Sequence, residues 1–73
     1  MVLTASKNKT YTLLIYKDKQ RKTHYLDAIS HTSKETITIL EFSKLSDIHK
    51  IYNEIVNLNK MKACTQKELF DIC

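Results

Sequence analysis

The chain has 73 residues, a formal net charge of +4, and neither glycine nor proline. This length leaves room for one domain only, and a domain so small rarely encloses a pocket of the size that substrates need. We therefore expect a single non-catalytic domain that holds no metal ion and no cofactor.

The chain begins with residues 1–8, which are polar and without periodicity, so we expect a flexible N-terminal segment followed by one domain over residues 9–73. Residues 9–16 alternate as a β-strand does, with β-branched and aromatic side chains throughout. Because large apolar groups fall on both faces of this strand, neither face is expected to meet much water.

Two further strands follow the first. Residues 17–22 are entirely polar and predict a hairpin connection, residues 23–30 a second strand, residues 31–34 a turn, and residues 35–42 a third strand. Without glycine, these turns must be built from Asn, Asp, Ser and Lys. The pattern predicts a three-stranded antiparallel meander.

Two helices complete the domain. Apolar side chains at helical spacing predict a long helix over about residues 44–59, with Ser43 as its N-cap and Asn59 as its stop. Thr65 and Glu68 form a capping-box pattern, which predicts a short second helix. The order β-β-β-α-α favours an α+β fold with both helices on one sheet face. The expected core comprises Leu13, Ile15, Leu26, Ile37, Ile39, Leu45, Ile48, Tyr52 and Ile55.

Charge is the feature that bears most on function. Residues 1–34 carry seven Lys or Arg against two acids, whereas residues 35–73 carry five lysines against six acids. A basic hairpin with nearby aromatic rings favours contact with phosphates and stacking on bases. The candidate nucleic-acid-binding residues are Lys17, Lys19, Arg21, Lys22, Lys9 and Tyr25, with Tyr11, Tyr16 and His24 as further stacking surfaces. The same lysines could instead keep the hairpin tip soluble and block edge-to-edge pairing.

Two functions therefore remain open: a small nucleic-acid-binding or regulatory protein that uses this hairpin, and a protein-protein interaction module such as an inhibitor, adaptor or assembly subunit. The short, lysine-rich and glycine-free composition suggests an AT-rich genome and fits a viral or mobile-element origin.

Helices on one face would leave the other sheet face apolar, so we expect a homodimer. Its interface would be that open face, or the edge of the first strand, and the residues assigned to it are Leu14, Tyr16, Leu40 and Phe42. If the helices cover the other face, the open face instead presents Tyr11, Leu13, Ile15, Ile37 and Ile39.

Cysteine and histidine placement completes the sequence argument. A helix between Cys64 and Cys73 would hold their Cα atoms roughly 12 Å apart, beyond the reach of a disulfide. The histidines and cysteines match no metal-ligand spacing. With no signal-peptide pattern and no long apolar run, we expect a cytoplasmic protein without membrane contact.

Overall fold

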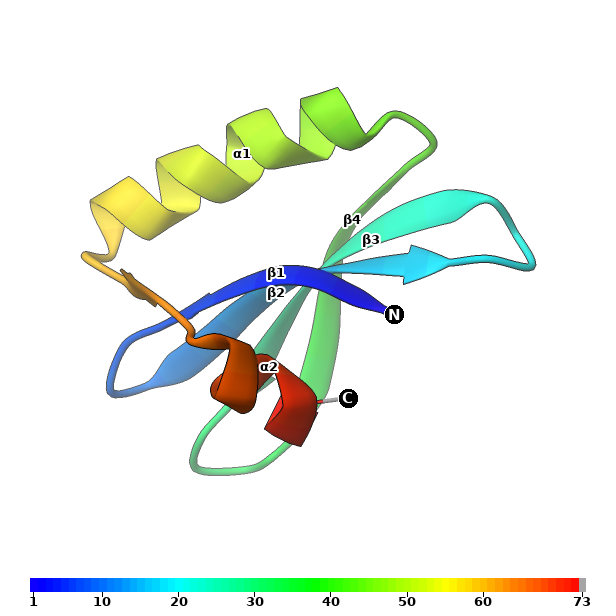
Figure 1. The fold of residues 1–73 in the computed structure, drawn as a ribbon. Helices are drawn as coiled ribbons and strands as arrows, with labels where there is room; N and C mark the ends of the chain where they lie inside the picture. The colour runs from blue at the N-terminus through cyan, green and yellow to red at the C-terminus, as the bar shows by residue number, and fades with distance from the viewer. Residues whose placement is uncertain (73) are drawn as a thin grey trace.

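The computed structural model describes residues 1–72 and shows an α+β fold, with a five-stranded antiparallel sheet and two helices (Figure 1). Its elements are β1 (Val2–Lys7), β2 (Tyr11–Asp18), β3 (Thr23–Ser30), β4 (Thr36–Phe42), α1 (Leu45–Leu58), β5 (Lys62–Ala63) and α2 (Gln66–Ile72). The strands lie in the order β4-β3-β2-β1-β5, and every neighbouring pair is antiparallel. The predicted α+β class is confirmed, and Cys73 lies outside the described residues.

The core forms where α1 crosses the middle of the sheet. Leu13 and Ile15 of β2 lie opposite Ala28 and Leu26 of β3, so these side chains share one face. The buried cluster on that face consists of Leu13, Ile15, Leu26, Ile48 and Tyr52, with Leu45 and Ile55 packed against it. Burial of these apolar side chains away from water is the main source of stability, and this part of the predicted core is confirmed.

The expected burial of Ile37 and Ile39 is wrong, since they are 56% and 43% exposed. Both lie on β4, an edge strand with a neighbour on one side only. The pairing of β3 with β4 also shifts between Leu26 and Asp27, which leaves Ile39 as the unpaired residue of a β-bulge.

Residues 2–7, which fall in the segment predicted to be flexible, form strand β1 of the sheet. Strand β1 pairs with β2 along most of the length of β1, and it also pairs with β5 through Ser6 and Lys7. Ala5 and Ser6 are only 2% and 3% exposed. β2 thus has a strand at each of its edges, β1 and β3, and the predicted meander omits both β1 and β5.

The two helices lie on opposite faces of the sheet, whereas the sequence predicted that they share one. Successive residues of a strand point to opposite faces. Ser6 hydrogen-bonds Tyr52 of α1, and the next residue, Lys7, forms an ion pair with Glu68 of α2. Figure 1 shows α1 above the sheet and α2 below it. The face that was expected to be open is therefore partly covered by α2.

The helix ends follow the prediction only in part. Lys44, not Ser43, is the N-cap of α1, and no side chain caps that end. Asn59 is the C-cap as predicted, but the left-handed residue is the next one, Lys60, with φ 51°. The capping box of α2 is confirmed: Thr65 N donates to Glu68 Oε1 over 3.1 Å, and Glu68 N donates to Thr65 Oγ1 over 3.3 Å. Neither helix, over the residues described, is long and apolar enough to cross a membrane.

Candidate nucleic-acid interface

The basic hairpin is the β2–β3 connection together with the end of β2, and we define it as Lys17, Lys19, Arg21 and Lys22. Asp18 pairs with Thr23 across the strands, which leaves a loop of residues 19–22. The Asp18 carboxylate accepts hydrogen bonds from Gln20 N (3.0 Å) and Arg21 N (3.2 Å) and so closes the turn. Lys22 takes the left-handed conformation, with φ 53°, that glycine would otherwise supply.

All four cations of the basic hairpin are exposed. Among the described side chains the one ion pair is Lys7–Glu68, so it involves none of the four. The pKa of Arg21 is raised, first by a hydrogen bond to Tyr25 and then by the charges of Tyr25, Asp18 and Glu41. Arg21 therefore has a hydrogen-bond partner and anionic neighbours, whereas Lys17, Lys19 and Lys22 are exposed cations outside the one described ion pair.

Two tyrosines lie beside the basic hairpin. Tyr16 and Tyr25 are directly opposed across β2 and β3, so their rings share the sheet face on which α2 lies. Tyr16 is 39% exposed, and Tyr25 is half-buried. An open cleft of about 540 Å³ adjoins Tyr16 and is lined by Met1, Tyr16, Lys17, Asp18, Lys19 and Gln20.

Lys9 does not lie with the basic hairpin, although the sequence placed it in the same set. It belongs to the β1–β2 turn at the other end of β2, and the eight residues of that strand separate the two ends by roughly 25 Å. Lys9 instead lines a cleft of about 400 Å³ together with Lys7, Asn8, Lys60 and Lys62. We call the four lysines of this second basic region the lysine cleft.

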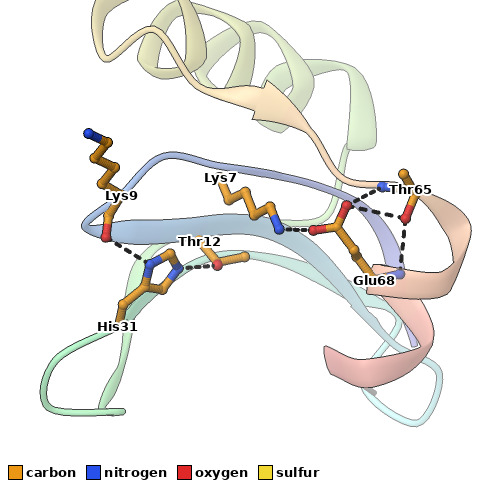
Figure 2. Close-up of polar contacts among 6 residues, drawn as sticks. All are labelled: Lys7, Lys9, Thr12, His31, Thr65 and Glu68. Carbon is orange, nitrogen blue, oxygen red and sulfur yellow. Dashed lines mark hydrogen bonds and ion pairs between the residues drawn. The ribbon is translucent and has the colours of Figure 1, made fainter.

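Polar contacts hold the lysine cleft together. Asn8 Oδ1 accepts hydrogen bonds from the backbone N–H groups of residues 10 and 11, each 2.8 Å long, and its amide donates to the carbonyl of Asn59 over 3.5 Å. Figure 2 shows His31 bridging the same turn: its Nδ1 donates to the Lys9 carbonyl (3.1 Å), and Thr12 Oγ1 donates to its Nε2 (2.7 Å). These contacts fasten the β1–β2 turn to the end of α1 and to β3.

The lysine cleft also contains a cross-strand pair of like charge. Lys7 and Lys62 are directly opposed across β1 and β5, an arrangement that destabilises a sheet. The Lys7 ammonium is neutralised by Glu68 of α2 (Figure 2). Sequence reasoning missed Lys7, Lys60 and Lys62, because residues more than fifty positions apart meet only through the β1–β5 pairing.

The other predicted stacking residues are placed differently. His24 is only 9% exposed, and its Nδ1 donates to the Ser43 carbonyl over 3.1 Å. It is a structural contact between β3 and the start of α1, so its proposed stacking role is wrong. Tyr11 is 42% exposed but lies at the lysine-cleft end of β2, away from the basic hairpin.

The predicted dimer interface is not a single surface. Leu14 is 4% exposed and is therefore part of the folded interior. Tyr16 shares the α2 face with Leu14, whereas Leu40 and Phe42 lie on the α1 face, opposite Leu26 and His24. The edge of β1, the second route predicted for dimerisation, is occupied near Ser6 by β5. The bulge at Ile39 and the position of α2 account for these differences.

The described residues contain no group of three or more His, Cys, Asp or Glu side chains placed to hold a metal ion. Cys64 is half-buried, and desolvation raises the pKa of its thiol while the charge of Lys7 opposes the rise.

Comparison with known proteins found no matching family, no similar curated protein and no similar solved structure. The functional argument therefore rests on the two basic regions and on the free sheet edge.

Proposed function

We propose that this protein is a small non-catalytic nucleic-acid-binding or regulatory protein whose basic hairpin contacts phosphates. The observation that carries the proposal is the loop of residues 19–22, in which three of four side chains are cationic, exposed and outside the one ion pair among the described side chains. Exposed cations outside an ion pair can replace the counterions condensed on a nucleic acid, and this exchange supplies most non-specific affinity.

The tyrosine pair beside the hairpin supports the same proposal. Exposed aromatic rings next to cations are the combination found in single-strand-binding surfaces, where base stacking contributes about 1–3 kcal/mol per base. Tyr16 and Tyr25 oppose each other three residues from the loop of residues 19–22, and Arg21 hydrogen-bonds Tyr25. We therefore favour single-stranded nucleic acid as the ligand of this end of the sheet.

The lysine cleft is a second phosphate-contacting region in this proposal. Of its four lysines only Lys7 pairs with a carboxylate, that of Glu68, so a bound phosphate would neutralise Lys9, Lys60 and Lys62. Since the two regions lie roughly 25 Å apart along β2, a bound single strand must span that distance to reach both.

The proposal is tested by comparing two charge-matched variants. Lys19→Gln with Arg21→Gln removes two charges from the hairpin, and Lys50→Gln with Lys67→Gln removes two exposed charges from the helices. For labelled single-stranded oligonucleotides of several sequences, the hairpin variant should bind more weakly, and its salt slope should fall by roughly 0.7 for each lost phosphate contact. The helix variant should bind as the parent does.

Equal losses in the two variants would show that only net charge matters, and unchanged binding of the hairpin variant would make the hairpin a solubilising tip. Tyr25→Leu adds a readout for stacking. It should weaken single-stranded binding by about 1–3 kcal/mol while leaving the salt slope unchanged.

The alternative function, a protein-protein interaction module, is favoured by one observation. Edge strand β4 exposes Ile37, Ile39 and Phe42, which are 56%, 43% and 38% exposed. Apolar side chains on a free edge are typical of surfaces that add a strand from a partner. No binding of single- or double-stranded oligonucleotides at low salt would leave this alternative as the better account.

A further inference from the structure

A second, smaller cleft lies beside the lysine cleft, between α1 and the sheet. It measures about 180 Å³, and we call it the apolar cleft. Its apolar lining includes Tyr11, Leu13, Ile55 and Met61, and its two polar residues are Asn8 and Asn59. Because ligand pockets usually measure about 300–1,000 Å³, the apolar cleft has room for one ring system and not for a whole ligand.

The two clefts are built from the same two chain segments. In the β1–β2 turn, Asn8 lines both clefts, Lys9 lines the lysine cleft and Tyr11 lines the apolar cleft. The segment that follows α1 divides in the same way, with Lys60 in the lysine cleft and Met61 in the apolar cleft. The hydrogen bonds of Asn8 join the two segments. A cationic surface and an apolar surface therefore lie side by side at the start of β2.

Two lysines are placed to hold an anion beside the apolar cleft. Figure 2 shows the side chain of Lys9 extending from the β1–β2 turn toward the side of the sheet on which α1 lies. Lys60 is exposed and closely follows α1, where its charge offsets the negative end of the helix dipole. Neither belongs to the one ion pair among the described side chains, whereas Lys7 is neutralised by Glu68. Lys9 and Lys60 are therefore the cations available to an anionic group.

We propose that the two clefts together bind one nucleotide of a single-stranded nucleic acid, with its base in the apolar cleft and its phosphate on Lys9 and Lys60. A nucleotide joins a planar ring system to an anionic group, which is the combination that the two clefts present. Tyr11 is 42% exposed, so its ring is accessible for stacking. The amide of Asn59 donates to the Ile55 carbonyl over 2.9 Å, while its Oδ1 accepts no hydrogen bond from the described residues. This oxygen can accept one from an amino group of the base.

The inference rests on the proposed function, because its ligand is a nucleic acid, and it adds a binding site for one base. The basic hairpin lies roughly 25 Å away along β2. A dinucleotide is too short to bridge that distance. Binding of a dinucleotide therefore reports on the two clefts without a contribution from the hairpin.

NMR titration of the isotope-labelled protein with a 5′-phosphorylated dinucleotide tests the proposal. The amide signals of residues 8–11 and 59–62 should shift together. A dinucleotide of equal charge whose 5′ sugar carries no base should bind roughly tenfold more weakly. Equal binding of these two ligands, or shifts confined to residues 17–25, would overturn the proposal. A free mononucleotide that binds more tightly than the dinucleotide would overturn the single strand as the ligand.

Two tyrosines of similar exposure on the same strand provide matched variants. Tyr11→Leu should weaken binding of the dinucleotide roughly tenfold and leave binding of the base-free ligand unchanged. Tyr16 is 39% exposed but lies at the other end of β2 and on the α2 face, so Tyr16→Leu should bind both ligands as the parent does. Equal effects of the two substitutions would contradict stacking on Tyr11.

Charge variants separate the failure of this inference from the failure of the proposed function. Lys9→Gln with Lys60→Gln should weaken both dinucleotides and lower the salt slope. Lys19→Gln with Arg21→Gln should leave both unchanged and weaken only longer oligonucleotides. If dinucleotides do not bind while longer oligonucleotides bind through the hairpin, the inference is wrong and the proposed function stands. If no oligonucleotide of any length binds at low salt, both are wrong.

Discussion

The hydrogen bond between Ser6 of β1 and Tyr52 of α1 gives the most direct test of how this fold is held together. The two residues lie 46 positions apart, and they are 3% and 5% exposed. Tyr52→Phe leaves Ser6 Oγ buried without a partner, and Ser6→Ala does the same to the Tyr52 hydroxyl. Each single change should cost about 1–3 kcal/mol, because the remaining group still lacks water.

The double variant should be far less damaging than the sum of the two. With both polar groups removed, only the net value of one hydrogen bond, about 1 kcal/mol, is lost. Urea denaturation of the four proteins gives the coupling energy, which we expect to exceed 1 kcal/mol. A domain of this size has a total stability of roughly 4–11 kcal/mol, so each single variant should also melt several degrees lower. Additive effects within about 0.5 kcal/mol would show that Ser6 and Tyr52 do not depend on each other, and that β1 is not fastened to α1 in this way.

Two further predictions follow from burial and backbone geometry. Leu14→Lys should destabilise the protein by about 3–5 kcal/mol, because Leu14 is 4% exposed, whereas Tyr16→Lys in the same strand should cost less than about 1 kcal/mol. Urea titrations that show equal stability for Leu14→Lys and Tyr16→Lys would contradict the burial of Leu14. Lys22→Gly and Lys34→Gly remove side chains from left-handed positions, with φ 53° and 63°. Each variant should raise the free energy of unfolding by up to about 1 kcal/mol. Only Lys22→Gly should weaken oligonucleotide binding. A loss of stability in both glycine variants would contradict the strain argument.

Local periodicity was sufficient to predict the elements that carry their own pattern. The 14-residue helix α1 and the strand β3 match their predicted ranges closely, because long apolar stripes and alternation persist through them. The capping box of α2 is equally local. By contrast, β1 contains small and polar residues, such as Ala5 and Ser6, that become buried only when β2 and β5 lie beside them. Such burial has no signature in the segment itself.

Two other errors have a common physical origin in the pairing between strands. The adjacent apolar residues Ile39 and Leu40 break the alternation of β4, and this break is the sequence signal of the bulge that was overlooked. A register change of one residue moves side chains to the other face, which is why Leu40 and Phe42 lie on the α1 face and not with Leu14. The basic hairpin could be predicted because its residues are consecutive. The lysine cleft could not, because it joins two segments that lie far apart in the chain.

The turns connect the composition of the chain with its proposed function. Each of the three positive-φ positions in residues 1–72 is a lysine, namely Lys22, Lys34 and Lys60. A left-handed conformation costs a non-glycine residue about 1–2 kcal/mol, which is a large share of the stability of a small domain. Lys22 belongs to the basic hairpin and Lys60 to the lysine cleft, so at these positions one side chain sets both the strain of the turn and the charge of the surface. Stability and phosphate binding should therefore change in opposite directions at Lys22 and Lys60. At Lys34, which lies in neither region, stability alone should change, and this contrast separates a phosphate-binding role of the turn lysines from a purely solubilising one.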